Sequence, residues 1–310
     1  MSDIQLFRLQ DNTVTELAAR TAKLERNLQL LIEANMETFL GIRFLATEYI
    51  TGKTHRGRVD SLGLDENGYP VIIEYKRTSD ENVISQGLFY LDWLMDHRAE
   101  FRFLVMDKLG KDAADRIEWS DTRLLCIAAD FTRYDVHAVQ QIPRNIELIR
   151  YKMFGDDLLL LELVNTHPAA DATTTASVEQ PSDEVAQSPK AASKDKSVVE
   201  QLASAAPEIQ SLYEQTAQLL LSMGDDVQQK SLKLYTAFRR LKNFACIVVS
   251  QSRLLVKLKL DPASVDFEEG FTRDVSQIGH WGTGDVEVSL RTTADLQKAL
   301  PLLTRSYVEN

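Results

Sequence analysis

Apolar and polar positions follow different periods in different parts of the first half of the chain. Residues 15–40 repeat leucine and isoleucine at helical spacing, which predicts one or two amphipathic helices. Residues 58–64 and 70–77 have strand-like patterns, and between them lies the segment DENGY at 65–69. Two such runs around an Asn-Gly turn predict a β-hairpin.

The rest of the first half alternates between helical and strand patterns. A helix, capped by Ser79 or Asp80, is expected over 79–97. After it we expect a strand, a polar helix and three further strands, within 101–107, 111–119, 122–130 and 146–164. This order predicts an α/β domain in which helices flank a mixed sheet.

The second half predicts a smaller α+β domain over residues 200–310. An amphipathic helix over 200–224 precedes three strand-like runs, a glycine-containing turn, another strand and a closing helix, so an antiparallel sheet is expected. Between the two domains, residues 166–199 are rich in Ala, Thr, Ser and Pro. Such a segment cannot bury enough apolar surface to order itself and is predicted to be a flexible linker, which leaves residues 1–165 as the first domain.

Composition narrows the class of protein. The 310 residues are 44% hydrophobic and 26% charged, as in ordinary globular proteins. No apolar run approaches the roughly 20 residues that span a bilayer, and the first residues lack the features of a secretory signal. Cys126 and Cys246 lie in apolar runs, as buried thiols of a reducing compartment do. We therefore expect a soluble cytoplasmic protein with no membrane partner.

The predicted hairpin brings three charged side chains together. If residues 66–68 form its loop, with Gly68 in the left-handed conformation, Asp60 faces Glu74 across the strand pair. Lys76 points to the same side as Glu74, because side chains alternate along a strand. A cation between the two carboxylates would relieve their repulsion, and Mg²⁺ suits such oxygen ligands and phosphodiester cleavage. Lys76 would then stabilise the attacking hydroxide or the developing negative charge, or help to lower the pKa of a water.

The alternative is an exposed strand end where these residues form ordinary surface ion pairs. Residues 71–76 (VIIEYK) are otherwise almost wholly apolar, as in a buried central strand. Charges in such a strand are costly unless they are paired or bind a metal, which favours the site.

The pattern resembles the PD-(D/E)XK nuclease superfamily, in particular its NucS-type and RecB-like endonucleases. The resemblance lies in GRVD at 57–60, IIEYKR at 72–77 and the pair Gln86 and Tyr90. It implies a restriction-endonuclease-like fold and a deoxyribonuclease that needs Mg²⁺ or Mn²⁺ and often works as a homodimer. It assigns catalysis to Asp60, Glu74, Lys76 and Gln86, metal binding to Asp60 and Glu74, and DNA contact or positioning to Gln86 and Tyr90.

The same resemblance implies an acidic residue on the first helix. Glu25 is the better match and Glu33 the second, although Glu25 also fits a solvent-facing helix position. A non-catalytic DNA-binding or regulatory protein on this fold, and a scaffold that recruits partners through its C-terminal domain, remain alternative functions.

Two groups of basic residues are candidates for DNA contact. The first flanks the hairpin and comprises Lys53, Arg56, Arg58 and Arg77. The second lies in residues 227–260, which hold eight bases and no acid, among them Arg239, Arg240 and Lys242. Tyr235, Phe238 and Phe244 are interleaved with them, as on nucleic-acid faces. Two alternatives remain open: the first group can be ordinary surface charge, and the aromatic residues of the second group can belong to the core.

Because the first domain is acidic, we expect its affinity for DNA to depend on the second domain. Residues 1–165 hold 20 basic and 27 acidic side chains, whereas residues 205–310 hold 12 and 13. The second domain resembles the C-terminal domain of proteins labelled "predicted transport protein", a label that implies no mechanism for these residues.

Overall fold

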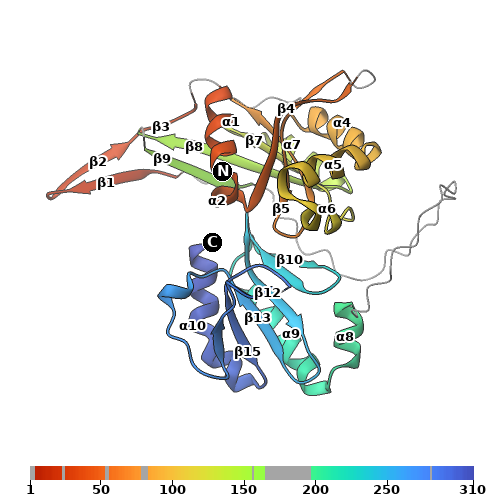
Figure 1. The fold of residues 1–310 in the computed structure, drawn as a ribbon. Coiled ribbons are helices and arrows are strands. Elements are labelled where there is room, and N and C mark those ends of the chain that lie inside the picture. Colours follow the sequence, from red (N-terminus) through yellow and green to blue (C-terminus); the bar gives the residue numbers. More distant parts are fainter. Residues whose placement is uncertain are drawn as a thin grey trace. The chain divides into compact units, whose positions relative to one another are not determined.

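The protein is described by a computed structural model over residues 4–22, 25–52, 56–77, 83–155, 157–164, 197–279 and 281–310. The chain divides into two compact units, Met1–Thr166 and His167–Asn310 (Figure 1). Of the predicted linker, only residues 197–199 are described, and α8 (Val198–Ser204) already begins there. No helix in the described ranges is long and apolar enough to cross a membrane.

The first unit is built on a seven-stranded mixed sheet with the order β3-β8-β7-β6-β5-β4, in which β9 also pairs with β8. Strand β5 pairs antiparallel with both of its neighbours, β4 and β6, whereas β6, β7 and β8 run parallel. The bounds of the strands are β3 (Ala19–Arg20), β4 (Ile42–Ile50), β5 (Arg58–Asp65), β6 (Pro70–Lys76), β7 (Arg123–Ala128), β8 (Asn145–Phe154) and β9 (Leu158–Leu163). This arrangement confirms the expected mixed sheet.

Helices cover both faces of this sheet. They are α1 (Glu25–Ala34), α2 (Met36–Leu40), α4 (Val83–Asp96), α5 (Arg98–Leu109), α6 (Lys111–Asp115) and α7 (Arg133–Gln141). The core on one face joins Leu62 and Ile72 to Leu91 of α4, while α1 reaches the other face, where Glu33 contacts Ser61. Since β6 is covered on both sides, it is apolar at nearly every position.

The predicted hairpin of β5 and β6 is confirmed, including its register. Leu62 pairs with Ile72, and the loop residue Gly68 has φ +85°. A side chain at Gly68 would also meet the carbonyl oxygen of Arg116, since a Cβ built there lies 2.6 Å from that atom. The turn therefore requires glycine on two grounds, its left-handed backbone and the space around it.

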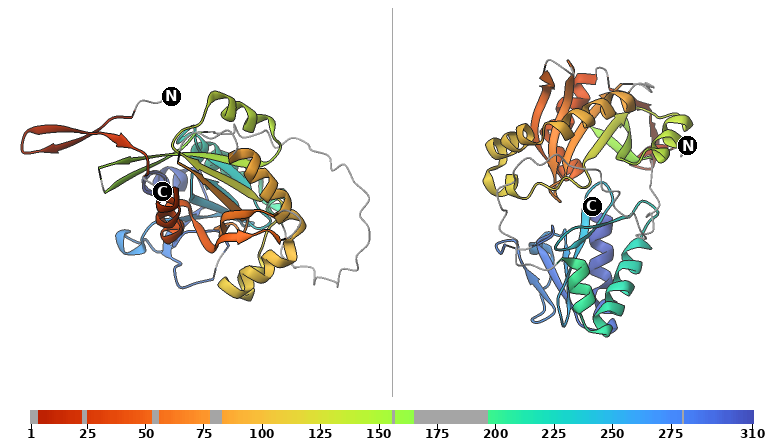
Figure 2. Two further views of the ribbon diagram at one scale, coloured as in Figure 1. Left: turned by 90° about the horizontal axis from the view of Figure 1, so that it is seen from above. Right: turned by 90° about the vertical axis from the view of Figure 1, so that its right-hand side faces the viewer.

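Two expectations for the first unit are wrong. Residues 101–107 belong to α5 and not to a strand, because Phe101 and Val105 are buried at helical spacing while Phe103 is exposed. Residues 15–20 lie in short strands, so the helical segment begins only at Glu25. The sequence also missed β4 and a hairpin of β1 (Leu6–Gln10) and β2 (Thr13–Leu17), which forms a separate ribbon extending from the unit (Figure 2).

The second unit has a six-stranded sheet with the order β10-β11-β12-β13-β15-β14, antiparallel throughout as expected. Its strands are β10 (Gln228–Ser231), β11 (Thr236–Arg239), β12 (Asn243–Val249), β13 (Leu254–Leu258), β14 (Thr272–Asp274) and β15 (Val286–Leu290). One core joins the sheet to α8, α9 (Pro207–Leu221) and α10 (Thr293–Glu309). The weak strands β10 and β14 were not predicted from the sequence.

Candidate functional site

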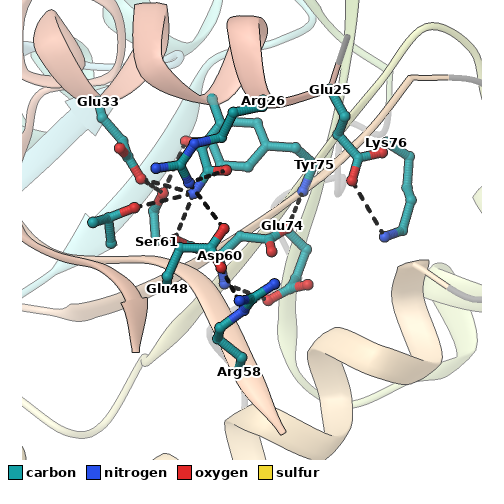
Figure 3. Close-up of polar contacts among 12 residues, drawn as sticks. Glu25, Arg26, Glu33, Glu48, Arg58, Asp60, Ser61, Glu74, Tyr75 and Lys76 are labelled. Atoms are coloured by element: carbon teal, nitrogen blue, oxygen red, sulfur yellow. Dashed lines mark hydrogen bonds and ion pairs between the residues drawn. The ribbon is translucent and has the colours of Figure 1, made fainter. Parts of the chain in front are cut away.

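Asp60 and Glu74 lie side by side where the hairpin ladder ends (Figure 3). The backbone N–H of Asp60 donates to Oε1 of Glu74 at 3.2 Å, and the backbone N–H of Tyr75 donates to Oδ2 of Asp60 at 3.0 Å. Each carboxylate thus accepts a backbone hydrogen bond from the neighbouring strand. The two side chains are fixed by backbone groups and not by flexible partners.

Glu74 is fully buried, and its second oxygen is unsatisfied. Its Oε2 has no hydrogen-bond partner among the described residues. Burial, and after it the charge of Asp60, raise the pKa of the Glu74 carboxyl to about 9. Burial also raises the pKa of Asp60, against the opposing effects of the Tyr75 N–H and the charge of Lys76. An acidic pair this costly to ionise is typical of a functional site.

Lys76 lies beside the pair and is held by Glu25. Its Nζ is 3.8 Å from Oε1 of Glu25, whose other oxygen accepts a hydrogen bond of 3.1 Å from the backbone N–H of Arg77. Glu25 is the first residue of α1, so the helix positions the ammonium group through one side chain. The structure therefore brings Glu25 to Lys76 and not directly to the carboxylate pair.

The donor set suits a hard divalent cation. It consists of carboxylate oxygens only, one of which, Oε2 of Glu74, lacks any partner in the described part of the chain. The described residues contain no cluster of three or more His, Cys, Asp or Glu side chains able to hold a metal. Asp60 and Glu74 alone would leave most coordination positions to water, as Mg²⁺ prefers.

Gln86 and Tyr90 position the start of β5. Gln86 Nε2 donates to the hydroxyl of Tyr90 at 3.3 Å, and the same hydroxyl accepts the backbone N–H of Arg58 at 3.2 Å. Gly57 lies against the ring, because a Cβ there would be 2.4 Å from a Tyr90 carbon atom. These contacts reach the strand two residues before Asp60, so they link α4 to the site through the backbone.

Gln29 is a positioning residue that the sequence did not reveal. Its buried amide donates to the carbonyl of Asp60 at 2.9 Å and to Oε1 of Glu33 at 3.0 Å. Glu33 in turn accepts the hydroxyl of Ser61 at 2.6 Å. Glu33, the second match for an upstream acid, therefore stabilises β5 from the α1 side. The available signal was the position of Gln29 on the buried face of α1, four residues after Glu25.

Glu48 is a third acidic residue beside the pair. The pairings Thr47–Ser61 and Tyr49–Val59 place it opposite Asp60 on β4, and its charge contributes to the raised pKa of Asp60. Its carboxylate contacts the guanidinium groups of Arg26 and Arg58 (Figure 3). It was missed because the strand that carries it was not predicted.

The remaining basic residues near the hairpin occupy varied positions. Arg77 is exposed, and its carbonyl accepts the hydroxyl of Tyr151 at 3.2 Å. Arg56 has a left-handed backbone conformation with φ +48°. Lys53 and the predicted helix caps Ser79 and Asp80 lie outside the described residues.

The basic residues of the second unit do not form one open stripe. Arg239 is buried, and its guanidinium donates to the carbonyls of Arg240 and Leu241. Arg240 pairs with Asp226 at 2.6 Å, and burial lowers the pKa of Lys242.

The interleaved aromatic side chains Tyr235, Phe238 and Phe244 are buried as well. The open alternative, that these aromatics belong to the core, is what the structure shows. DNA contact by Arg240 and Lys242 remains a prediction.

The second unit matches a known family, and the chain as a whole has a known relative. Residues 198–310 match a family described as "Domain of unknown function (DUF5655)". An uncharacterised protein of Haemophilus influenzae is 27% identical over 307 residues, covering 98% of this chain and 99% of the relative.

Two solved structures show a weak likeness to the chain. A repair endonuclease from Pyrococcus abyssi matches with a TM-score of 0.28 and 21% identity, over 44% of this chain and 51% of its own. A complex of EndoMS with double-stranded DNA matches with a TM-score of 0.24 and 16% identity, over 47% and 64%. The chain thus spans about half of the first of these proteins and just under two thirds of the second.

Proposed function

We propose that the first unit is a nuclease that hydrolyses phosphodiester bonds in DNA with the help of Mg²⁺ or Mn²⁺. The observation that carries this proposal is the buried pair Asp60 and Glu74 beside Lys76, with Oε2 of Glu74 left without a partner. A buried acceptor without a hydrogen bond is costly, and a functional ligand is one reason for keeping it.

In this proposal Asp60 and Glu74 would hold the cation, which when bound would supply Lewis-acid polarisation of the phosphoryl group and a water of lowered pKa. The two backbone N–H donors, on Asp60 and Tyr75, keep the carboxylates in place. A cation would favour the ionised state of Glu74, which burial and Asp60 now disfavour.

Lys76 supplies positive charge where negative charge develops on the phosphoryl oxygens. Glu25 orients the ammonium group from α1, while Gln29 and the Gln86–Tyr90 pair hold the β5 backbone. These contacts come from two different helices, α1 and α4. Those of Gln29 and Tyr90 hold the backbone at Asp60 and at Arg58, two residues before it.

A non-catalytic DNA-binding protein is the second candidate. It is favoured by the small number of acidic ligands, since no cluster of three metal-binding side chains occurs in the described ranges.

Cutting both strands of a duplex would require two copies of this site, so the nuclease proposal includes a homodimer, which light scattering can detect. The buried free thiols Cys126 and Cys246 suit a cytoplasmic location.

Cleavage of labelled single-stranded, duplex and mismatched DNA, and of RNA, tests the nuclease proposal. The full chain should cleave at least one DNA with Mg²⁺ or Mn²⁺ and lose activity in EDTA. Asp60→Asn and Lys76→Met should abolish cleavage, whereas the exposed control Asp96→Asn should retain it. Equal cleavage by Asp60→Asn would contradict the proposal, and DNA binding without cleavage would favour the second candidate.

A further inference from the structure

A carboxylate held between two arginines lies next to the proposed catalytic pair. One carboxylate oxygen of Glu48 pairs with the guanidinium group of Arg26, and the other pairs with that of Arg58. We propose that Arg26 and Arg58 form a phosphate-binding subsite, which Glu48 occupies as an internal anion until a phosphate of the DNA backbone displaces it. This inference rests on the proposed function only in taking DNA as the source of the phosphate.

The geometry of the contact matches the recognition of a phosphate. Nη1 of Arg26 lies 2.9 Å from Oε1 of Glu48, and Nε of Arg58 contacts Oε2. A phosphodiester also presents two charged oxygens on one centre, and arginine binds carboxylate and phosphate with the same fork of donors. Glu48 therefore occupies the place that such a group would take between the two guanidinium groups.

Both arginines are tied to the backbone of Asp60. Arg58 precedes Asp60 by two residues on β5 and so points to the same side of the sheet. Arg26 donates to Oε1 of Gln29 at 3.2 Å, and Gln29 donates to the carbonyl of Asp60 at 2.9 Å. A phosphate held by these two side chains would therefore be fixed relative to the catalytic carboxylates.

The arginines are accessible to a ligand. The side chains of Arg58 and Arg26 are 64% and 46% exposed, whereas that of Glu48 is 25% exposed. Exposed ion pairs contribute little stability in water, so exchange of the Glu48 carboxylate for a phosphate is cheap. Phosphate binding also releases counterions from DNA, which favours the exchange.

The backbone of Glu48 is strained. Its φ of +51° lies in the left-handed region, which is unfavourable for a residue with a β-carbon. Its neighbours Thr47 and Tyr49 are paired with Ser61 and Val59 of β5, so strand pairing surrounds the strained position. Residues kept in such a conformation cluster at catalytic and ligand-binding sites, which supports a subsite here.

The salt dependence of DNA binding tests the proposal without any cleavage. Fluorescence anisotropy of a short labelled duplex and of one of its strands is measured in EDTA between about 50 and 200 mM salt. Arg26→Gln and Arg58→Gln should each lower the slope of log K against log salt by about 0.9 on the duplex, one phosphate contact each. Arg58→Lys, which keeps the charge, should restore the slope.

Glu48→Gln should tighten binding by about two- to fivefold, the equivalent of one exposed ion pair. Matched controls come from Arg102 and Asp115, an exposed ion pair between α5 and α6. Arg102→Gln and Asp115→Asn should leave both the slope and the affinity unchanged. Thermal melting of each variant establishes that it is folded.

Unchanged slopes for both arginine variants, or weaker binding by Glu48→Gln, would overturn the subsite while leaving cleavage by the wild type untouched. Equal losses in the Arg102 control would also overturn it, because the effect would then be one of net charge. A wild-type protein that binds neither DNA overturns the subsite too, whereas the proposed function is decided separately by cleavage with Asp60→Asn.

Discussion

Replacing Glu74 by glutamine should stabilise the protein in the absence of divalent cations. Glutamine has the shape of the protonated acid, and its oxygen can still accept the N–H of Asp60. Its amide carries no charge, so the repulsion from the Asp60 carboxylate that raises the pKa of Glu74 is absent in the variant. The substitution removes only the group whose ionisation the fold disfavours.

The size of the effect follows from the pKa of Glu74, which burial and Asp60 raise from 4.5 to about 9. Between these values the unfolded chain is ionised while the folded protein keeps its proton. The folded wild type therefore loses about 1.4 kcal/mol of stability for each pH unit above 4.5, until the folded group itself ionises near pH 9. At pH 7 this loss amounts to about 3 kcal/mol.

Urea unfolding in EDTA at pH 5 and pH 8 measures the effect. A Trp281→Phe background leaves Trp93 and Trp119, both in the first unit, as the fluorescent reporters. The advantage of Glu74→Gln over its parent should be about 1 kcal/mol at pH 5 and about 5 kcal/mol at pH 8. Glu37→Gln, at an exposed position on α2, serves as the control and should show no such change.

An advantage that does not grow with pH would refute this reasoning, as would a variant less stable than its parent. The first result would mean that Glu74 titrates normally in the folded protein. The second would mean that a contact of the ionised carboxylate stabilises the fold by more than its burial costs. The Asp60–Glu74 pair would then stabilise the fold, instead of being a functional site kept at a cost in stability.

Three further outcomes follow from the same structure. Mg²⁺ or Mn²⁺ should raise the melting temperature of the wild type but not of Asp60→Asn, which calorimetry can measure; equal shifts would place cation binding elsewhere. Arg123→Met should destabilise the first unit by about 3–5 kcal/mol in urea unfolding, because the buried Arg123 pairs with Asp65 and Glu147, both buried and each 2.9 Å away. Tyr90→Phe should cost about 1 kcal/mol of stability through loss of the Arg58 N–H bond and should lower cleavage as well, while full activity would deny it a positioning role.

The core of the candidate site was predictable because it is local. A three-residue loop ending in Gly68 sets the register of β5 and β6, and this register puts Asp60 beside Glu74. Alternation along β6 then places Lys76 on the same side. Every step spans a few residues of one hairpin, where turn geometry and the period of the strand leave a single arrangement.

The surroundings of the site were not predictable from local patterns. The hydrogen bond from Gln29 to Asp60 joins residues 31 positions apart in the sequence, and the contact between Arg26 and Glu48 joins residues 22 positions apart. These contacts exist only because α1 packs on the sheet and β4 pairs with β5. The pattern of β4 is irregular, with a register shift between Phe44 and Ala46, so the strand lacked the alternation that identifies one.

The sequence also left open which charged and aromatic side chains are buried and which are exposed, and the tertiary structure decides this. Phe101 and Phe103 alternate as in a strand, yet they lie on the buried and exposed sides of α5. Arg239 belongs to a basic, aromatic-rich run, yet its guanidinium is turned to backbone carbonyls inside the second unit. Sequence alone determined the hairpin and its acids, since backbone geometry acts over short distances. Only the tertiary structure decided which charges reach solvent and which partners they meet, since these depend on packing between distant segments.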